Sequence, residues 1–420
     1  MPPLAPLLKK LRAVTAVAAL GSSVEAARRL HLSPSAVVRA VQQVEAALGL
    51  RLFERSPRGL AETAAARALA TRTGRALDLL AAAGPPMAGS PFATLLGLQP
   101  VPMGWTGSRL ATNIGHRHLQ ALLGVAEDGA ERQAAAALGI SQSALHQTLA
   151  QLEHLAGGAL FDRTRGGLRL NPRGEALWRA ARWALDELRQ AAEELATTPE
   201  GALRGVVTIG TLPFSTALFL PAAVERALAQ HPELQITVID GVYETLAGAL
   251  RDARIDLLVG ALRPAPRWPE LTQEALFADQ LAVVARAGHP LARRRAPLSL
   301  AALQSHGWVL PMADTPADKA FEQAFRAEGL APPAAGPRVN SALLMEALVS
   351  SGDRLAMMSS RQITRQVDAG LLAVLPVALR HPPRRIGLTT RRDWLPTPAA
   401  ASLLAAVREA CGGLGEPARR

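Results

Sequence analysis

The first half of the chain shows apolar residues at helical spacing. Ala26, Ala27 and Leu30 lie on one helix face, a tight turn follows, and Ser33 stands where a second helix needs an N-cap. The apolar spacing of that second helix continues to Gly49, and glycine commonly ends helices. The pattern predicts two short helices joined by a tight turn.

A second stretch repeats the first. When Leu11 is placed on Leu119, residues 11–60 align without a gap, and 19 of 50 positions are identical. The identical pairs include Ser33/Ser141, Glu45/Glu153, Phe53/Phe161, Arg55/Arg163 and Gly59/Gly167. Because an alanine-rich composition alone would not align these residues, we expect an internal duplication.

Both copies continue with the same short pattern. Leu-Phe-acid-Arg is followed by a glycine turn, at Gly59 in the first copy and at Gly166-Gly167 in the second. This predicts a two-stranded wing that carries arginine beside a DNA backbone, and the helix pair predicts a helix-turn-helix whose second helix enters the major groove. Long Ala/Leu-rich helices, about 63–83 and 172–195, predict a helix–helix interface within or between chains.

The second half alternates between strand and helix signals. The predicted strands are VVTIG 206–210, QITVID 235–240, IDLLVG 255–260, LAVVA 281–285, WVLP 308–311, RLAMMS 354–359, AVLPV 373–377 and RIGLTT 385–390. Predicted helices lie between them, and a last helix covers about 398–410. This alternation favours an α/β fold with parallel sheets.

Composition and charge narrow the class of protein. The 420 residues are 49% hydrophobic and 19% charged, which suits packed domains, and the single Cys411 excludes a disulfide framework. No apolar run reaches about 18 residues and no leader pattern is evident, so we expect a cytoplasmic protein without a membrane partner. The net charge is +11, of which residues 1–86 carry +7 (12 basic, 5 acidic) and residues 109–196 carry zero (10 and 10). An excess of this kind favours a polyanionic partner.

The segments SPSAVVRAVQQVEAALGLRLFERSPRGL (33–60) and SQSALHQTLAQLEHLAGGALFDRTRGGLRLNPRGEAL (141–177) resemble the winged helix-turn-helix of LysR-type transcriptional regulators. The C-terminal part, including AGHPLA (287–292), is similar to the effector domain of that family. The resemblance implies two α/β lobes, with the chain crossing near Arg286, returning near Arg380 and binding ligands between the lobes. The tandem headpiece departs from the usual single one, which puts the usual dimer geometry in doubt.

The expected fold class is therefore α/β overall. Two mostly helical winged helix-turn-helix domains precede a two-lobed effector domain that resembles periplasmic binding proteins. The expected domains are 1–86 and 109–198 for the headpieces with their long helices, 87–108 for a Gly/Pro-rich linker, and 201–420 for the effector domain. Lobe I is expected over about 203–285 and 381–412, and lobe II over about 286–380.

The candidate DNA-binding residues lie on the second helix and wing of each copy. They are Ser33, Ser35, Arg39, Gln43, Arg55 and Arg58, and Ser141, Gln142, Ser143, Gln147, Gln151, Arg163 and Arg165. Glutamine and serine can hydrogen-bond base edges, whereas arginine also attracts phosphate. We expect the first headpiece to contribute more non-specific affinity, and Pro34, opposite Gln142, to weaken its base reading.

The candidate effector-binding residues lie where strands lead into helices. They are Thr211, Leu212, Pro213, Ser215, Thr216, Tyr243, Ala261, Asn340, Ser341 and Ser359. Hydroxyls and free N–H groups at such junctions can hold an anion, which favours a small carboxylate such as an aromatic or sugar-derived acid. An equally weighted alternative is that these hydroxyls only cap helices, and Tyr243 fits a structural, half-buried ring better.

Several kinds of chemistry have no sequence support. The chain has no phosphate loop, no GxSxG elbow and no HExxH, and His116-x-His118 lacks a third metal ligand, so no enzyme activity, metal or cofactor is expected. The leading hypothesis is a homo-oligomeric, effector-responsive regulator that binds double-stranded DNA. The alternative is a cytoplasmic small-molecule-binding protein in which one or both headpieces serve dimerisation.

Overall fold

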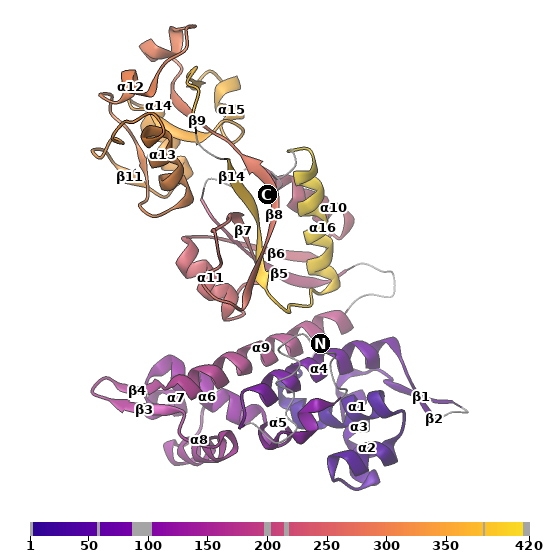
Figure 1. Cartoon of the computed structure of the whole chain (residues 1–420). Helices are drawn as coiled ribbons and strands as arrows, with labels where there is room; N and C mark the ends of the chain where they lie inside the picture. Colours follow the sequence, from indigo (N-terminus) through magenta and orange to yellow (C-terminus); the bar gives the residue numbers. More distant parts are fainter. Residues whose placement is uncertain are drawn as a thin grey trace. The chain divides into compact units, whose positions relative to one another are not determined.

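The computed structural model describes residues 3–56, 59–85, 103–196, 203–213, 218–380 and 383–414. The chain divides into two compact units, Met1–Gly201 and Ala202–Arg420, and each unit is described by itself (Figure 1). We call residues 3–85 the first headpiece and residues 103–196 the second headpiece. The effector-type unit is the second of the two compact units.

The two headpieces have the same order of elements. The first contains a 3-10 turn η1 (Ala5–Leu7), α1 (Leu8–Leu20), α2 (Ser23–Leu30), α3 (Pro34–Leu48), the hairpin β1 (Phe53–Ser56) and β2 (Gly59–Glu62), and α4 (Ala64–Ala82). The second contains a 3-10 turn η3 (Gly104–Gly107), α5 (Arg109–Asn113), α6 (His116–Asp128), α7 (Glu131–Ala137), α8 (Gln142–Ala156), the hairpin β3 (Phe161–Thr164) and β4 (Gly167–Leu170), and α9 (Pro172–Leu195). The helix-turn-helix and hairpin predicted from sequence are thus found in each copy.

Residues that are identical in the two copies make the same structural contacts. Glu45 accepts a hydrogen bond from the backbone N–H of Leu52 at 2.7 Å, and Glu153 accepts one from Leu160 at 2.9 Å. These carboxylates hold the entry of each hairpin against its helix. The shared glutamates are therefore explained by the fold itself.

A shared glycine brings each hairpin close to the end of an earlier helix of its headpiece, α1 in the first copy and α6 in the second. Gly59 and Gly167 have φ angles of 117° and 112°, which side chains rarely adopt. A Cβ on Gly167 would also lie 2.3 Å from the carbonyl oxygen of Gly129, which ends α6 in the left-handed conformation. This close approach requires glycine at the hairpin.

The long helices α4 and α9 join the headpieces. A single apolar core runs through both copies and includes Leu69, Leu77 and Leu80 of α4 and Leu177 and Leu188 of α9. The interface predicted from the apolar stripes therefore forms within the chain.

The first residues of the second headpiece take part in this packing. Met103 and Trp105 are buried in the shared core. The linker expected over 87–108 is therefore too long at its C-terminal end, because these two apolar side chains find a site on α4; residues 86–102 lie outside the described residues.

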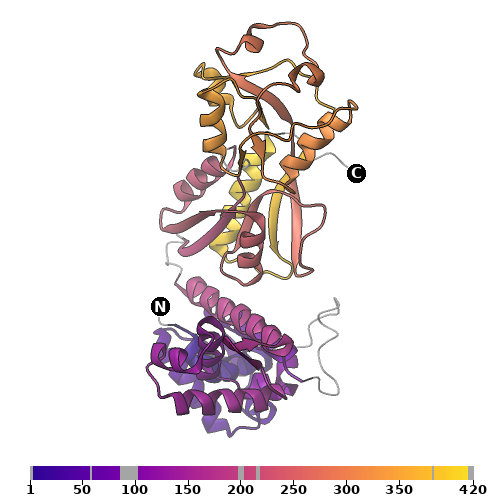
Figure 2. The same cartoon turned by 90° about the vertical axis from the view of Figure 1, so that its left-hand side faces the viewer.

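Lobe I of the effector-type unit is a mixed five-stranded sheet of order β6-β5-β7-β14-β8. Figure 2 shows this unit from a second side. Its strands are β5 (Gly205–Thr211), β6 (Leu234–Asp240), β7 (Leu257–Ala261), β8 (Leu271–Asp279) and β14 (Arg384–Arg391). Helices α10 (Leu220–Gln230) and α16 (Pro398–Gly412) pack into one apolar cluster with the sheet, and α11 (Tyr243–Arg251) packs into another.

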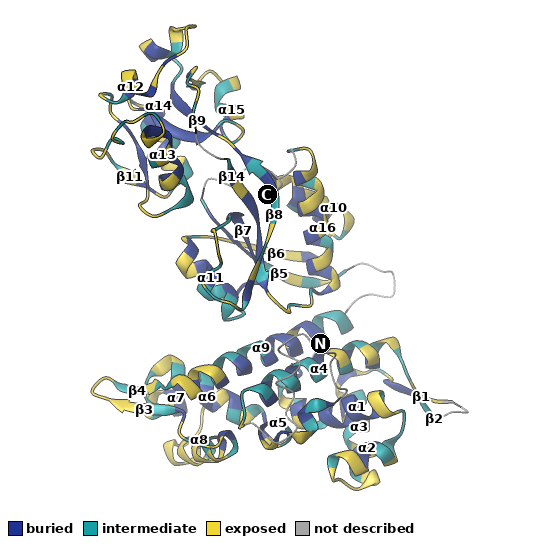
Figure 3. Cartoon of the chain, in the orientation of Figure 1, coloured by how far each residue is buried: buried dark blue, intermediate teal, exposed yellow. Residues whose placement is uncertain are grey.

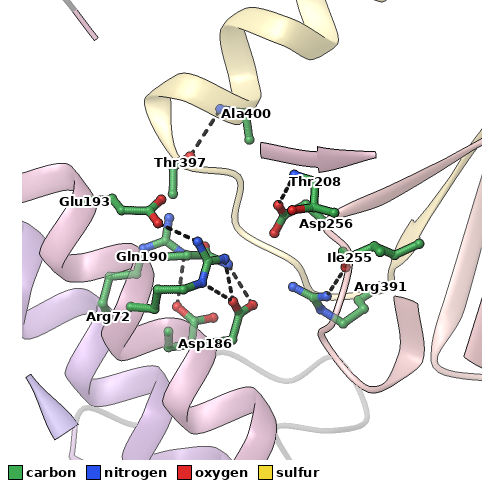
Figure 4. Close-up of polar contacts among 12 residues, drawn as sticks. Arg72, Asp186, Gln190, Glu193, Thr208, Ile255, Asp256, Arg391, Thr397 and Ala400 are labelled. Atoms are coloured by element: carbon green, nitrogen blue, oxygen red, sulfur yellow. Dashed lines mark hydrogen bonds and ion pairs between the residues drawn. The ribbon is translucent and has the colours of Figure 1, made fainter. Parts of the chain in front are cut away.

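Polar side chains secure the ends of lobe I elements. Asp256 accepts a hydrogen bond from the backbone of Thr208 at 2.8 Å, and Arg391 donates to the carbonyl oxygen of Ile255 at 3.1 Å (Figure 4). Thr397 caps α16 by accepting from the N–H of Ala400 at 3.1 Å (Figure 4). These bonds fix the strand β14 and the helix that follows it.

Lobe II contains a three-stranded antiparallel sheet of order β12-β9-β13 and a short parallel pair β10-β11. The strands are β9 (Leu281–Arg286), β10 (Leu310–Pro311), β11 (Arg338–Val339), β12 (Ala356–Ser359) and β13 (Leu372–Val374). A 3-10 turn η4 (Pro290–Arg293) and helices α12 (Leu300–Leu303), α13 (Pro316–Arg326), α14 (Ala342–Ser350) and α15 (Thr364–Asp368) complete the lobe. Trp308 forms edge-on contacts with Phe321 and Phe325 in its core.

Two sequence predictions for this unit are wrong. The sheets are not parallel throughout, because β14 pairs antiparallel with both β7 and β8 and lobe II is antiparallel around β9. The crossing point also differs: lobe I ends with β8 at Asp279, and Leu281–Arg286 is the central strand of lobe II. Strand β8 was missed because Leu271–Asp279 mixes polar and apolar residues, as suits a half-buried edge strand.

Candidate nucleic-acid interface and hinge site

Helices α3 and α8 begin with the same serine arrangement. Ser33 accepts a hydrogen bond from the N–H of Ala36, and Ser141 accepts one from Ala144, each at 3.2 Å. The hydroxyls of Ser35 and Ser143 lie 3.1 and 3.0 Å from the cap hydroxyls. All four predicted serines are exposed at helix N-termini, where free N–H groups and a partial positive charge favour an anion.

The outward face of each second helix carries the predicted polar side chains. Arg39 and Gln43 of α3 are exposed, as are Gln142 and Gln147 of α8, whose outer face is largely yellow in Figure 3. Arg39 and Gln147 occupy equivalent positions of the two copies. The two helices therefore present different chemistry from the same place.

Gln151 differs from the other predicted residues of α8. It hydrogen-bonds the ring of His118, at the N-terminus of α6. Burial is the main cause that lowers the pKa of His118, and this hydrogen bond opposes it. Gln151 is thus engaged inside its own headpiece, so its side chain is less free than those of Gln142 and Gln147 to contact a base.

Each hairpin presents an arginine to solvent. Arg55 of β1 and Arg163 of β3 are exposed, and their side chains make no hydrogen bond or ion pair with the described residues. Arg165 is exposed in the turn between β3 and β4, while Arg58 lies outside the described residues. Unlike the shared glutamates, the shared wing arginines have no explanation within the described part of the fold.

The second headpiece carries more acidic residues beside its hairpin than the first headpiece does at the equivalent positions. The charged residues that line an open groove between the end of α6 and the hairpin are four acidic ones, Glu127, Asp128, Asp162 and Glu175, and one basic one, Arg169. The positions of the first headpiece equivalent to the four acidic residues are Ala19, Leu20, Glu54 and Arg67. The excess of acidic residues disfavours phosphate on this side of the second headpiece, so we expect DNA contact at the serine end of α8 and the hairpin tip instead.

The first group of predicted effector residues is engaged inside lobe I. Thr211 is buried and donates to Asp240 at 3.0 Å, and Leu212 packs with Tyr243 in the cluster under α11. The Tyr243 ring is covered by the guanidinium of Arg263 at 4.4 Å, and its hydroxyl accepts from the N–H of Arg267 at 3.4 Å. Leu212 and Tyr243, which are candidate effector-binding residues, thus pack into the core of lobe I.

The other predicted effector residues divide into three groups. Ala261 is buried at the end of β7, and Pro213 lies in the turn after β5. Ser341 caps α14 by accepting from the N–H of Leu344 at 3.2 Å, and the adjacent Asn340 is exposed. Ser215 and Thr216 lie outside the described residues.

Ser359 belongs to a buried polar cluster at the hinge between the lobes. It ends β12 and donates to Asp279 at 2.6 Å, and Asp279 ends β8 with its side chain fully buried. Arg384, at the start of the returning strand β14, forms an ion pair with the other oxygen of Asp279. Both strands that link the lobes therefore meet in this cluster.

The hinge cluster has one unsatisfied donor. The Arg384 side chain is 5% exposed, and its Nε has no hydrogen-bond partner among the described residues. Arg384 and Ser359 line a small hollow together with Leu281, Pro311, Ala317, Met345, Met357 and Met358. The hollow measures about 10 Å³, room for about one water molecule.

Sequence reasoning missed Asp279 and Arg384. Each is a charged residue at the end of an apolar strand, directly beside the point where the chain changes lobe. A charged residue at a strand end beside the lobe crossing could have indicated a polar cluster at the hinge. The sequence did not reveal it, because β8 was not recognised as a strand.

The described residues show no metal site. No group of three or more His, Cys, Asp or Glu side chains lies close enough to hold an ion in the described part of the chain. His118 uses its Nδ1 to accept from the N–H of Gly115 at 3.1 Å. Nor does the described part contain a helix long and apolar enough to cross a membrane.

Paired helix-turn-helix segments, followed by a two-lobed domain with a hinge, define a class of DNA-binding regulator. The description "Bacterial regulatory helix-turn-helix protein, lysR family" matches residues 8–67 and 116–175, and "LysR substrate binding domain" matches residues 200–412. The chain belongs to the LysR family of transcriptional regulators.

Named relatives support this membership. The HTH-type transcriptional regulator GalR of Pseudomonas putida is 34% identical over 406 residues, which cover 96% of this chain and 97% of that protein. The regulator PcaQ of Agrobacterium fabrum is 30% identical over 304 residues, which cover 72% of this chain and 96% of that protein. These relatives carry the names of regulators of transcription.

Two solved structures share the fold. ArgP from Mycobacterium tuberculosis is 20% identical, covers 72% of this chain and 98% of its own, and superposes with a TM-score of 0.56. A full-length variant of OxyR from Pseudomonas aeruginosa is 19% identical, covers 70% of this chain and 93% of its own, and has a TM-score of 0.51.

Proposed function

We propose that this protein is a transcriptional regulator that contacts double-stranded DNA with both headpieces, which arose by tandem duplication. The observation that carries the proposal is the pair Arg55 and Arg163. They are identical in two copies that differ at 31 of the 50 aligned positions, they are exposed, and their side chains make no hydrogen bond or ion pair with the described residues. An exposed arginine next to a helix-turn-helix is well placed to contact phosphate.

Salt-dependent binding tests DNA contact directly. The full chain is titrated onto a fluorescent duplex taken from upstream of its own coding sequence, at several salt concentrations. Because each neutralised phosphate releases counterions, the logarithm of the affinity should fall linearly with the logarithm of salt. A salt-independent or undetectable interaction would favour the alternative, in which the headpieces serve dimerisation.

We further propose that the effector is a small carboxylate, such as an aromatic or sugar-derived acid, bound at the hinge. The support is the buried Arg384 with its unsatisfied Nε, because a buried donor without a partner costs free energy that an acceptor oxygen would recover. Asn340, the N-terminus of α14 and the apolar side chains around the hollow extend the candidate site. This differs from a site made of hydroxyls and helix ends alone, since the hinge supplies an arginine.

The present hollow is too small for such a ligand. Binding therefore requires the lobes to open around the hinge, and a ligand that bound the open form better would shift the population towards it. Calorimetry of the full chain with a panel of acids tests this. An Arg384→Gln/Asp279→Asn variant, which removes both charges together, should lose at least tenfold in affinity, whereas Ser299→Ala, at the cap of α12, should not.

We also propose that the protein is a homo-oligomer. Strand β6 lies at the edge of the lobe I sheet and exposes Val238 at 48% and Ile239 at 42%. An apolar edge strand is a natural pairing surface. Sedimentation of a Val238→Lys variant tests the role of this edge, and an unchanged mass would assign the oligomer to another surface.

A further inference from the structure

Helices α4 and α9 carry the same apolar stripe but differ in the charged residues beside it. With the copies aligned at Leu11 and Leu119, Leu69 corresponds to Leu177, Ala76 to Ala184, and Leu80 to Leu188, and all are buried. The apolar stripe alone would let each helix pair with a second copy of itself. Residues outside the apolar stripe must therefore determine whether each helix pairs with the other helix or with a second copy of itself.

The ion pairs between the helices supply that choice. Arg72 donates to Glu187 at 2.9 Å and to Glu194 at 3.0 Å, and Arg75 donates to Glu187 at 2.8 Å. The Arg72 side chain is 1% exposed. Burial lowers the pKa of Arg72, but the hydrogen bonds and charges of Glu194 and Glu187 outweigh burial and raise it.

The order of these partners defines the direction of pairing. Arg72 reaches Glu194 and Glu187, whereas Arg75, one turn further along α4, reaches the earlier of the two glutamates. The helices therefore run antiparallel. Figure 4 shows Arg72 of α4 near the polar face of α9, where Gln190 also donates to Asp186 at 2.8 Å.

The equivalent positions lack matching charges. Ala180 and Trp183 stand in α9 where α4 has Arg72 and Arg75, and Leu79 stands in α4 where α9 has Glu187. Pairing of α4 with another α4 would place Arg72 and Arg75 opposite Leu79. Pairing of α9 with another α9 would place Glu187 opposite Ala180 and Trp183. Either like pairing would therefore lose the ion pairs of Arg72 and Arg75 with Glu187, and breaking a buried ion pair is strongly unfavourable.

Other contacts tie the same two headpieces together along the chain. Arg12 of α1 is buried and donates to the carbonyl oxygen of Ile114, just before α6. The backbone N–H of Trp105 hydrogen-bonds Asp78 of α4. Residues near the start of the second headpiece thus contact the first, Ile114 on α1 and Trp105 on α4.

We propose that α4 and α9 pair within one chain, so that a single chain presents two unlike recognition helices to one DNA duplex whose two halves differ in sequence. The second part rests on the proposed function. In Figure 1, the hairpins β1–β2 and β3–β4 point to opposite ends of the unit, with α4 and α9 running between them. Arg39 in α3 stands where α8 has Gln147, and Pro34, which cannot hydrogen-bond a base, stands where α8 has Gln142, so the two helices would read different base pairs.

Reversing the charges of the α4–α9 ion pairs, either within one chain or on two different chains that are then mixed, tests the pairing without DNA. One chain carries Arg72→Glu/Arg75→Glu, a second carries Glu187→Arg/Glu194→Arg, and a third carries all four changes. Hydrogen exchange of the α4 peptide is measured for each chain alone and for an equimolar mixture of the first two, refolded together. Arg67→Glu, an exposed change whose partner Glu62 lies in the first headpiece, is the control for charge reversal on α4.

The proposal expects at least tenfold faster exchange in both half-reversed chains, recovery in the four-fold variant, and no recovery in the mixture. Recovery in the mixture would overturn it, because α4 would then pair with α9 of another chain. Failure of the four-fold variant to recover, or no effect of the half-reversals beyond that of Arg67→Glu, would also overturn it, because the charges would not specify the pairing.

Footprinting on the upstream duplex tests whether the two headpieces contact different halves of the DNA site. Arg55→Ala and Arg163→Ala, made separately, should each remove protection from a different half of the footprint. Loss of the same half, or equal loss of both, would overturn this part of the proposal. If no footprint forms, the proposed DNA binding fails while the exchange experiment still reports on the pairing.

Discussion

At the scale of single residues, Asp78 couples the first headpiece to pH. Burial raises the pKa of its carboxyl to about 6, and the Trp105 N–H and Arg75 oppose the shift only in part. Because the folded state binds the proton more tightly than the unfolded state, ionisation costs stability as pH rises from about 4 to about 6. The stability that Asp78 contributes is present below about pH 4 and lost above about pH 6.

The Asp78→Asn variant should therefore be more stable than the parent chain at pH 7.5, by about 1–3 kcal/mol at about 1.4 kcal/mol per pKa unit. At about pH 3, below the pKa of Asp78 in both the folded and the unfolded state, the two chains should differ little. Urea midpoints of the far-ultraviolet dichroism at both pH values measure this, with the exposed Asp162→Asn as control. An equal gain at both pH values would show that packing, not ionisation, is responsible.

Cys411 offers a second residue-scale prediction. The thiol is 3% exposed in α16, and burial raises its pKa to about 12. Since the thiolate is the reactive form, iodoacetamide at pH 8 should modify the native chain at least tenfold more slowly than the chain in urea. An exposed Ser305→Cys addition, which should react at once, controls for reagent quality; rapid modification of Cys411 itself would contradict its burial.

Single residues also show where sequence reasoning stops. The cap serines, wing arginines and hairpin glycines could be predicted because local pattern and internal repetition both point to them. Tyr243 and Thr211 could not be placed, since whether a side chain at a strand end faces a cleft or the core depends on neighbours such as Asp240 and Arg263. Asp279 and Arg384 are 105 residues apart and meet only through the lobe crossing.

At the scale of elements, strongly periodic helices were predicted almost to their ends, and edge strands were not. Ser33, Thr63 and Ser141 cap helices where the sequence indicates. Strand β8 has no clean alternation, and its nine residues gain strand conformation from pairing along the whole of β14. That pairing is a tertiary effect which local pattern does not contain.

Arg39 of α3 and Gln147 of α8 occupy equivalent positions, so each can be replaced by the residue found in the other copy. Arg39→Gln should lower the salt slope of DNA binding by about one, because one phosphate contact is lost, and Gln147→Arg should raise it by about one. Titrations on upstream and unrelated duplexes measure both slopes. If neither substitution changes the slope on either duplex, these faces do not lie against DNA.

At the scale of the whole molecule, the effector must act on the protein's conformational populations. A carboxylate held by Arg384 would contact both strands that link the lobes, and would therefore favour one lobe angle over others. Binding to the folded state alone also stabilises it, by about 2.7 kcal/mol when the free ligand is at about 100 times its dissociation constant.

An acid that binds at the hinge should thus raise the unfolding temperature of the full chain and alter its footprint on upstream DNA. Both effects should disappear together in Arg384→Gln/Asp279→Asn, and both should persist in Ser299→Ala. An acid that stabilises the double variant as strongly as the parent chain binds elsewhere, and the hinge would then have to be abandoned as its site.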